Sequence, residues 1–475
     1  MKERKPNVVI EDVSIADMSS EGMGIARIEG KVIFVKGAVP GDVATIELRK
    51  SKKKFSEAIV KELKSPSPFR VTPACQHFGV CGGCKWQHLD YSKQLAFKTQ
   101  TVEDALVRIG KLEIPAIAPI LGCAESFYYR NKLEFTFTDR MWLTEAEINS
   151  GAEFNRNGLG FHVPESFSGV LDIAHCHLQA EPSNAIRLSV KKFALENDYT
   201  FFNLKTQEGL LRNLMIRTTS IGELLVLVSF FENDEEKIKV LMNHLATEFP
   251  QITSLQYVYN PKRNDTIYDL ETIIFKGNKY ITEMLGDYKF KIGPKSFFQT
   301  NSKQAKVLYD VTKSFAELKP EDVVYDLYTG VGSIGIYVSA DCKRVVGIEQ
   351  IEPAIADAKE NAKLNNVTNC SFYAGDVRMV LQKDFIEKNG KPDVVITDPP
   401  RAGMHEEVVR TLLELAAPKI VYVSCNAATQ ARDLQLFSEK YVVAKVQPVD
   451  MFPQTTHIEN VVLLLLKQAQ LCSQN

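Results

Sequence analysis

The sequence of 475 residues predicts an α/β protein whose last part is a doubly wound, largely parallel sheet. From about Lys279 onward, short apolar runs alternate with stretches of helical periodicity, as in successive strand–helix units. One run is followed by a glycine-rich turn, Gly330-x-Gly332-x-x-Gly335, which is typical of the first strand–helix turn of such sheets. Before this part, the chain predicts a small β-barrel and an α+β central domain that carries a cluster of cysteines.

Composition limits the possible classes of protein. The length suggests about three domains, and 45% hydrophobic with 24% charged residues is ordinary for globular proteins. A net charge of −2 means that any nucleic-acid-binding surface must be a local patch. The first six residues lack the apolar core of a signal peptide, and no apolar run reaches membrane-spanning length. We therefore expect a cytoplasmic protein without membrane contact, and a monomer.

Residues 1–64 predict the β-barrel. Short β-branched runs at Val8–Ile10, Lys31–Val35 and Val43–Leu48 are separated by glycine and proline turns. Basic residues cluster after the third run: Arg49, Lys50, Lys52, Lys53, Lys54, Lys61 and Lys64. They are either a solvated basic edge strand, because lysine protects edges from aggregation, or a phosphate-binding face.

The central region, residues 65–278, contains an amphipathic stretch at Tyr91–Ile109 and three closely spaced cysteines, Cys75, Cys81 and Cys84. Gly82-Gly83 between the last two lets the backbone fold tightly. Three thiolates need a fourth ligand. With four cysteines the site suits a [4Fe–4S] cluster; zinc is the rival, because histidines also lie near in sequence: His77, His88, His175 and His177.

The third region, residues 279–475, contains the predicted strands of the parallel sheet: Val323–Leu327, Arg344–Glu349, Asp393–Thr397, Ile420–Ser424 and Val461–Leu466. Helical patterns, for example Ser302–Ala316 and Pro353–Asn365, separate them.

The glycine-rich turn also matches a dinucleotide fingerprint, because Glu349 lies 19 residues after Gly330, where an acidic residue holds a ribose. A nicotinamide dehydrogenase is therefore an alternative. Asp326, four residues before the first glycine, argues against it, because a carboxylate there would repel a pyrophosphate. It favours a cofactor with cationic groups and no phosphate, which is S-adenosylmethionine. Asp376 would then meet the adenine edge.

A potential nucleophile and a potential base lie in the last sixty residues. Cys425 ends an apolar run in Val421-Tyr-Val-Ser-Cys-Asn426, and Glu459 lies in Phe452-Pro-Gln-Thr-Thr-His-Ile-Glu459. An ionised thiol is a strong nucleophile, and a carboxylate can accept a proton. Each alone could be structural: a buried cysteine at a strand end, or a solvated charge. Arg401 and Arg432 are candidates for lowering the pKa of the thiol.

These two segments, with Asp326–Gly335 and Asp398-Pro-Pro-Arg401, resemble the uracil-5 RNA methyltransferases that use S-adenosylmethionine. Residues 1–64 likewise resemble the TRAM domain, an OB-like RNA-binding barrel. The resemblance implies a Rossmann-like methyltransferase domain in which Cys425 adds to uracil C6 and Glu459 removes the C5 proton. It implies a [4Fe–4S] cluster with Cys176 as the fourth ligand, and packing of residues 90–118 on the catalytic domain. Its cofactor-binding residues are Gln299, Tyr328, Gly330, Glu349, Asp376 and Asp398.

The resemblance covers almost the whole chain and is strongest to enzymes that act on 23S ribosomal RNA. Transfer RNA is the second candidate substrate. A cytosine-5 methyltransferase is disfavoured because Arg401 occupies the place where those enzymes usually carry a second cysteine. A non-catalytic RNA chaperone is a further alternative. Two positions depart from the family pattern: Ala427 replaces a usual proline, and Ser333 an asparagine found in some relatives.

Overall fold

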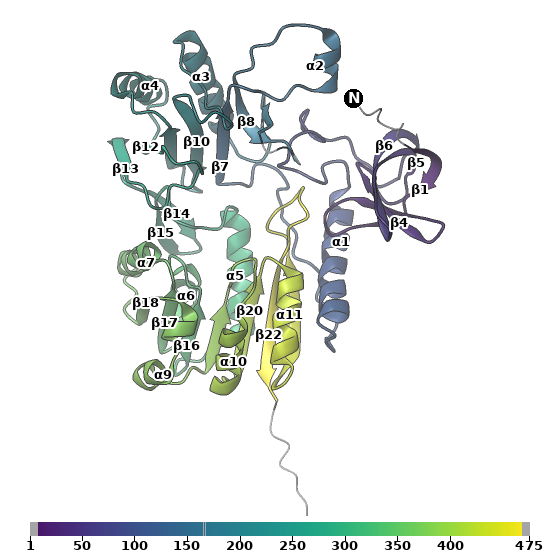
Figure 1. The fold of residues 1–475 in the computed structure, drawn as a ribbon. Helices are drawn as coiled ribbons and strands as arrows, with labels where there is room; N and C mark the ends of the chain where they lie inside the picture. The colour runs from purple at the N-terminus through teal and green to yellow at the C-terminus, as the bar shows by residue number, and fades with distance from the viewer. Residues whose placement is uncertain (1–7, 165, 167, 468–475) are drawn as a thin grey trace, which may run out of the picture.

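The computed structural model describes residues 8–467 except 165 and 167, and it contains three β-sheet regions (Figure 1). The barrel, the central region and the parallel sheet follow one another along the chain. In Figure 1 the central region lies above the parallel sheet, and the barrel lies at one side, next to α1 (Tyr91–Asp104). The residues that bear on a signal peptide, 1–7, are outside the described part.

The barrel is a six-stranded sheet with the order β1-β5-β6-β4-β3-β2. Its strands are β1 (Val9–Ser14), β2 (Asp17–Met18), β3 (Gly24–Ile28), β4 (Lys31–Lys36), β5 (Val43–Ser51) and β6 (Phe55–Ser65). Alternate side chains point inward and form a small core that includes Ile33, Val35 and Ile46. Lys52–Lys54 form the exposed tip of the β5–β6 hairpin. β5 and β6 each pair with two neighbours, but β1 reaches β5 only as far as Glu47 and β4 reaches β6 only as far as Ile59. The other basic residues of the cluster, Arg49, Lys50, Lys61 and Lys64, therefore lie on strand parts with one partner, so both interpretations of the cluster stay open.

The central sheet has seven strands in the order β13-β12-β11-β10-β7-β8-β9. They are β7 (Lys132–Thr138), β8 (Gly158–His162), β9 (Val170–Asp172), β10 (Leu211–Thr218), β11 (Leu224–Phe230), β12 (Ser254–Tyr259) and β13 (Thr272–Gly277). Its helices are α2 (Glu145–Ser150), α3 (Ser183–Glu196) and α4 (Glu235–Glu248). Apolar residues of α3 and α4, such as Ile186 and Leu241, pack on the sheet in one core with Val226.

Helix α1 belongs to the central region in sequence but packs on the parallel-sheet region. It begins at Asp90, whose side chain accepts a hydrogen bond from Ser92 N (2.9 Å). It continues into a π-helical turn, η1 (Ala105–Ile109), where Leu106 enters the same core as Ala431. Figure 1 shows α1 alongside α11 (Ala427–Phe437).

The parallel-sheet region starts with the hairpin β14 (Ile281–Leu285) and β15 (Tyr288–Ile292). Its seven-stranded sheet has the order β18-β17-β16-β19-β20-β22-β21. The strands are β16 (Val323–Leu327), β17 (Arg344–Glu349), β18 (Cys370–Ala374), β19 (Val394–Thr397), β20 (Lys419–Ser424), β21 (Tyr441–Val449) and β22 (Glu459–Leu466). The first five in this order are parallel, and β22 is antiparallel to both β20 and β21.

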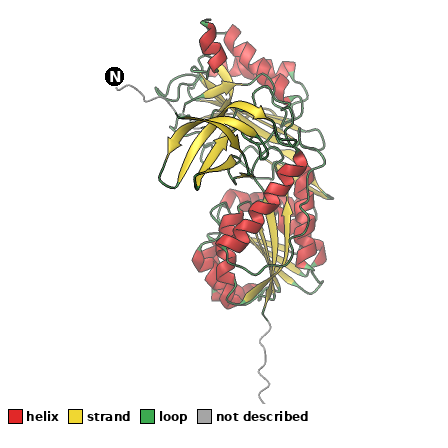
Figure 2. Cartoon of the chain, turned by 90° about the vertical axis from the view of Figure 1, so that its right-hand side faces the viewer, coloured by secondary structure: helices red, strands yellow, loops and turns green. Residues whose placement is uncertain are grey.

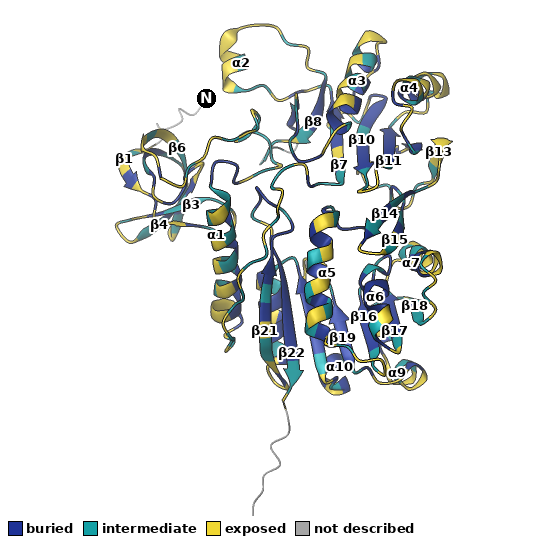
Figure 3. Cartoon of the chain, turned by 180° about the vertical axis from the view of Figure 1, so that it is seen from behind, coloured by how far each residue is buried: buried dark blue, intermediate teal, exposed yellow. Residues whose placement is uncertain are grey.

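Helices cover both faces of this sheet (Figure 2): α5 (Ser302–Ala316), α6 (Ser333–Val338), α7 (Glu352–Leu364), α8 (Val377–Val380), α9 (Lys383–Asn389), α10 (Glu406–Leu415) and α11, with a 3₁₀ turn, η2 (Ser339–Asp341). The inner strands are consequently buried along their length (Figure 3). The strand order reverses between β16 and β19, and ligands of doubly wound sheets bind at the carboxyl ends of strands around such a point. Within the described part of the chain, no helix is both long and apolar enough to cross a membrane.

Candidate active site

The candidate nucleophile and the acidic residues predicted for catalysis and cofactor binding lie at one edge of the parallel sheet. Asp326 is near the carboxyl end of β16, Glu349 ends β17, Asp398 follows β19 and Cys425 follows β20. The carboxyl ends of parallel strands meet at one edge. Glu459 joins them because β22 is antiparallel, so that its first residue lies where its neighbours end. The strand pattern alone therefore brings residues from five segments together.

The turn that carries Cys425 is tied to the Asp398–Arg401 segment. Asn426 caps α11, and its Oδ1 accepts hydrogen bonds from Ala428 N (3.1 Å) and Thr429 N (3.4 Å). Its Nδ2 donates to the carbonyl oxygen of Arg401 (3.1 Å). The asparagine next to the thiol thus fixes both the helix and the neighbouring loop.

The first residue of α11 is Ala427, at the position where the resemblance predicts proline. Proline is favoured at the first position of a helix because its φ is already suitable. Since Asn426 still caps the helix, the alanine removes a restriction of the backbone and leaves the hydrogen bonds in place.

Burial and neighbouring acidic groups raise the pKa of Glu459, of Asp398 and of the Cys425 thiol. The pKa of Glu459, which is buried, lies well above its usual value because of desolvation and the charge of Asp398, with Arg401 opposing. Burial, and then the charge of Asp326, raise the pKa of Asp398 to about 7. Burial, Glu459 and Asp398 raise the pKa of Cys425 to about 11, again against Arg401. A cation placed among these groups would stabilise the ionised form of each.

Arg432, which the sequence indicated as a candidate for lowering the pKa of the Cys425 thiol, has other contacts. Its guanidinium donates to Asp433 Oδ1 (2.6 Å) and to the carbonyl oxygens of Ala402 (3.0 Å) and Met404 (3.1 Å). Of the two predicted arginines, only Arg401 contributes to the pKa of Cys425.

The glycine-rich turn encloses Asp326. Its Oδ2 accepts hydrogen bonds from the hydroxyl of Thr329 and from Gly335 N (2.9 Å). A Cβ at Gly335 would lie 2.9 Å from that oxygen, so a larger residue would displace the carboxylate. The other oxygen, Oδ1, is buried and has no hydrogen-bond partner among the residues that the structure describes. A buried carboxylate oxygen of this kind calls for a donor from a bound ligand.

The predicted ribose ligand contacts the same turn. Glu349 Oε2 accepts a hydrogen bond from Gly330 N (3.2 Å), and Oε1 accepts one from Ile351 N (2.9 Å). Tyr328, half-buried, starts the turn with a positive φ of 63°, a conformation rare outside glycine. Asp376 caps α8, and its carboxylate forms an ion pair with Arg378 (2.7 Å), which lowers its pKa.

Gln299, the remaining predicted cofactor ligand, lies in the segment before α5 and not at the ends of the strands. It is buried just before α5, and its carbonyl oxygen accepts a hydrogen bond from Asn131 Nδ2 (2.9 Å). The nearby cap of α5, Asn301, donates from Nδ2 to the carbonyl oxygen of Met451 (3.0 Å). These contacts bind the Gln299 segment to the central region and to the connection that leads to Glu459.

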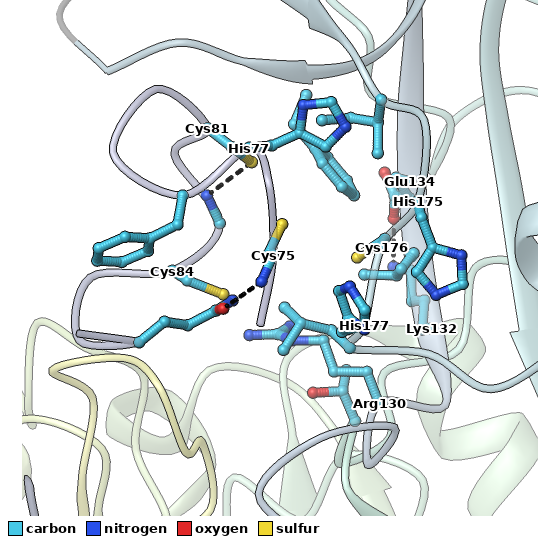
Figure 4. A pocket seen from close by; sticks show the side chains of 18 residues that line it. Cys75, His77, Cys81, Cys84, Arg130, Lys132, Glu134, His175, Cys176 and His177 are labelled. Carbon is cyan, nitrogen blue, oxygen red and sulfur yellow. Dashed lines mark hydrogen bonds and ion pairs between the residues drawn. The ribbon is translucent and has the colours of Figure 1, made fainter. Parts of the chain in front are cut away.

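The four predicted cysteine ligands line one cavity of about 340 Å³ (Figure 4). Cys75, Cys81 and Cys84 come from an irregular loop after the barrel, and Cys176 faces them from the segment after β9. Burial raises the pKa of Cys81 to about 12 and that of Cys84 to about 11. Among the described residues, no three histidine, cysteine or acidic side chains are grouped so that they could hold a metal ion.

The histidines considered as zinc ligands have other contacts. His77 Nε2 accepts a hydrogen bond from Ala174 N (2.8 Å), and His177 contacts the hydroxyl of Tyr128 (2.9 Å). His77, His175 and His177 border the cavity, whereas His88 packs against Phe78 and is absent from the lining.

Sequence reasoning missed a buried ion pair between α1 and the segment that leads to Glu459. Lys98 Nζ on α1 lies 2.6 Å from Asp450 Oδ1, and both side chains are fully buried. The sequence signal that could have indicated this ion pair was a lysine on the apolar side of the predicted amphipathic helix.

Comparison with known proteins agrees with this geometry. The family model described as tRNA (uracil-5-)-methyltransferase matches residues 218–467, and the TRAM domain model matches residues 7–61. The chain belongs to the uracil-5 RNA methyltransferase family. It is therefore an S-adenosylmethionine-dependent enzyme with an N-terminal RNA-binding TRAM barrel, and the dehydrogenase and chaperone alternatives are set aside.

Relatives of this methyltransferase match over nearly its full length. An uncharacterized RNA methyltransferase of Bacteroides thetaiotaomicron is 52% identical, covering 95% of this chain and 100% of that protein. One from Porphyromonas gingivalis is 51% identical over 95% of this chain and 99% of its own. Among solved structures, the Pyrococcus abyssi tRNA (uracil-54, C5)-methyltransferase in complex with S-adenosyl-L-homocysteine has 29% identity and a TM-score of 0.74, and covers 96% of this chain and 100% of that one.

Proposed function

We propose that this enzyme methylates C5 of a specific uridine in 23S ribosomal RNA, with Cys425 as nucleophile and Glu459 as base. The observation that carries the proposal is that Cys425 directly follows β20 and Glu459 begins its antiparallel neighbour β22, at the sheet edge that also holds Asp326 and Asp398. A thiol, a buried carboxyl group and acidic residues that suit a cationic cofactor, all in one place, are what the reaction requires.

The thiol solves the first chemical difficulty, because C5 of an intact uracil ring is a poor nucleophile. Cys425 gives up its proton and its sulfur adds to C6, which leaves C5 enolate-like and able to attack an electrophilic methyl group. The base must be unstacked to meet the thiol, so the target is a flipped or unpaired uridine.

Glu459 acts after the methyl group has reached C5. Its carboxylate takes the C5 proton, and the electron pair of the C–H bond expels the Cys425 sulfur from C6 as a thiolate. The thiolate regains from solvent the proton that the thiol gave up to solvent before the addition. A raised pKa makes its ionised form a stronger base. Arg401 lowers that pKa, so it favours the ionised form that proton removal needs, also after the positive charge of the sulfonium has been lost with the methyl group.

The proposed cofactor ligands are Gln299, Tyr328, Gly330, Glu349, Asp376 and Asp398. S-adenosylmethionine supplies a methyl group on a positively charged sulfur. The unpaired Oδ1 of Asp326 offers an acceptor to a cationic group, and Glu349 offers its carboxylate to ribose hydroxyls. Asp376 is held by Arg378, so it would share its carboxylate with that arginine when it meets the adenine edge.

Variants of the two catalytic residues test the mechanism. Cys425→Ala should abolish methylation and any covalent adduct with RNA while still binding the cofactor. Glu459→Gln should permit attack and methyl transfer but not proton removal, so a methylated protein–RNA complex should accumulate. RNA with 5-fluorouridine at the target should trap the unaltered enzyme in the same way. Methylation by Cys425→Ala would disprove the role of the thiol, and normal turnover by Glu459→Gln would assign the base elsewhere.

Transfer RNA is the second candidate substrate, and one comparison favours it. The sequence interpretation took the barrel and the cysteine cluster as signs of a ribosomal RNA enzyme. However, the Pyrococcus abyssi structure, whose title names a tRNA methyltransferase, aligns with 96% of this chain. Domain content therefore does not separate the two substrates. Mapping 5-methyluridine in 23S and transfer RNA from a strain without this gene would decide, because the lost modification identifies the substrate.

We further propose that Cys75, Cys81, Cys84 and Cys176 hold a [4Fe–4S] cluster. A zinc ion needs four donors at about 2.3 Å from a single point. In a cubane cluster each thiolate binds a different iron, so the thiols surround a volume. The observation that supports the cluster is that all four thiols line one cavity of about 340 Å³. The cluster would serve as a structural or RNA-contacting group, because the methyl transfer needs no electron.

Domain boundaries at residues 64 and 278 and a monomeric state complete the proposal. The parallel sheet from residue 279 would be the catalytic domain, although α1 packs against it from the central region.

A further inference from the structure

The connection between β21 and β22, residues 450–457, is held almost wholly by parts of the chain outside the catalytic sheet. We call it the base loop, because it leads into Glu459. Tyr129 donates from its hydroxyl to the carbonyl oxygen of Pro453 (2.9 Å), and Asn301 binds that of Met451 (3.0 Å). Lys85 N and Trp86 N, directly after Cys84, both donate to the carbonyl oxygen of Gln454 (2.8 and 3.1 Å).

Helix α1 contributes a row of polar side chains to this loop. Tyr91, Gln94 and Lys98 are spaced by three and four residues and so share one face of the helix. Tyr91 donates to Asp450 Oδ2 (2.9 Å), and Lys98 pairs with Asp450 Oδ1 (2.6 Å) and donates to the carbonyl oxygen of Phe452 (3.0 Å).

Gln94 makes a reciprocal pair with Gln454. Gln94 Nε2 donates to Gln454 Oε1 (3.0 Å), and Gln454 N donates to Gln94 Oε1 (3.0 Å). Gln454 has a φ of +66° after Pro453, in a turn closed by Thr455 N and the carbonyl oxygen of Phe452 (3.3 Å). Positive φ at this position normally selects glycine or asparagine. Gln454 therefore adopts an unfavourable backbone conformation at a position where its side chain binds Gln94 of α1.

Stability alone does not explain this row of buried polar side chains on α1. Replacing a buried ion pair by apolar residues of similar volume is often neutral or stabilising, because desolvation offsets the attraction between the charges. What the polar contacts add is direction: each fixes one atom of the loop relative to α1. The same loop binds Asn301, two residues after Gln299, and continues into Glu459.

We propose that Gln94 and Lys98 are positioning residues for the methylation reaction, which hold the base loop so that Glu459 faces the uracil. This inference rests on the proposed function of Glu459. It assigns to α1, which lies outside the catalytic sheet, a part in the second half of the reaction, the removal of the C5 proton.

Two variants test this proposal: the single substitution Gln94→Met, and the double substitution Lys98→Met with Asp450→Asn. The second keeps an amide oxygen as acceptor for Phe452 N while removing both charges. Gln100→Met is the matched control, because Gln100 lies on the exposed side of the same helix and bonds only to Asp104 in the described part of the chain. Folding is checked by melting temperature and by the affinity for S-adenosyl-L-homocysteine.

We expect both test variants to lower kcat at least tenfold, with KM for RNA changed less than about threefold, and to accumulate methylated covalent adduct on ordinary RNA. Trapping by 5-fluorouridine RNA should proceed at the normal rate, because Cys425 is unaffected. A purely structural role would lower adduct formation and folded fraction together, and activity equal to that of Gln100→Met would also overturn the proposal. Glu459→Gln, measured in parallel, separates the two claims: if it fails to trap adduct, the assignment of the base is wrong.

Discussion

At the residue scale, the site has an apparent contradiction. The proposed nucleophile, Cys425, has a pKa of about 11, so its thiol is almost fully protonated at neutral pH. The causes are burial and two acidic neighbours, and the same acidic surroundings favour a cationic ligand. We therefore expect the thiol to become more reactive when the positive charge of the cofactor is present. This would disfavour attack on RNA without a methyl donor.

This coupling predicts the pH dependence of Cys425 alkylation. A raised pKa means that the thiolate fraction rises about tenfold per pH unit until the pH nears 11. S-adenosylmethionine should shift this profile to lower pH relative to S-adenosyl-L-homocysteine, which lacks the sulfonium charge. The measurement is iodoacetamide labelling of the Cys425 peptide by mass spectrometry, with Cys425→Ala to identify it. Superimposable profiles with the two ligands would contradict the coupling.

A second residue-level prediction concerns Gly335. In Gly335→Ala the new Cβ would lie 2.9 Å from Asp326 Oδ2, so the carboxylate must move. We expect cofactor affinity to fall at least tenfold with a small change in melting temperature, measured by calorimetric titration. Gly222→Ala, at a turn where a Cβ meets nothing within 4 Å, is the control for a glycine replacement. Equal affinity in both variants would show that Asp326 does not contact the cofactor.

The sequence predicted the residues of the sheet edge but not their surroundings. Cys425 and Glu459 could be found because motifs with fixed spacing carry them. Asp326 could be found because its position before a glycine turn has a chemical meaning. Lys98 and Gln94 were missed because their partners lie 352 and 360 positions away in the sequence, and no local pattern encodes such a contact. The role of Arg432 depended on side-chain direction, which a sequence does not give.

At the element scale, strands with continuous β-branched runs were predicted best. Val323–Leu327 and Arg344–Glu349 form β16 and β17 with the predicted bounds. β18, with the sequence Cys-Ser-Phe-Tyr-Ala, lacks such a run, and β21 contains a proline and a register shift. Both lie at the outer edges of the sheet, where burial imposes a weaker pattern. β6 was missed for another reason, since its many charged residues were assigned to a basic cluster.

The hairpin tip of the barrel gives a prediction at this scale. Lys52–Lys54 are exposed at a turn, which suits contact with RNA phosphates better than the middle of a strand. Replacing all three by glutamine should weaken RNA binding and reduce the log–log slope of affinity against salt by up to about three units. The control replaces Lys383, Lys388 and Lys391, near α9 at the far end of the molecule from the barrel (Figure 1). Equal slopes for both variants would leave the tip as an ordinary solvated turn.

At the scale of the whole molecule, the loop that carries Cys75, Cys81 and Cys84, which we call the cysteine loop, links the three regions of the chain. Trp86, two residues after Cys84, is buried among Met18 and Val39 of the barrel, and its backbone N–H binds the base loop. A group that fixes the cysteine loop would thus also fix the path from the barrel to Glu459.

The corresponding prediction concerns the bound group. Protein purified without oxygen should be brown and contain iron and sulfide in about equal amounts, and Cys81→Ser should be colourless with a lower melting temperature. Cys342→Ser, a buried cysteine outside the cavity, is the control and should keep the colour. A colourless preparation with stoichiometric zinc would replace the cluster by a zinc site.

The ion pair between Lys98 and Asp450 also has a consequence for biosynthesis. Residues that are 352 positions apart must meet, so α1 leaves the ribosome long before its partner has been translated. Until then its polar row and its apolar neighbours, Val102 and Leu106, have nothing to cover them. Cys425 is translated before Glu459. Because the base loop both holds α1 and leads into Glu459, the seating of α1 and the placement of Glu459 depend on the same late segment of the chain.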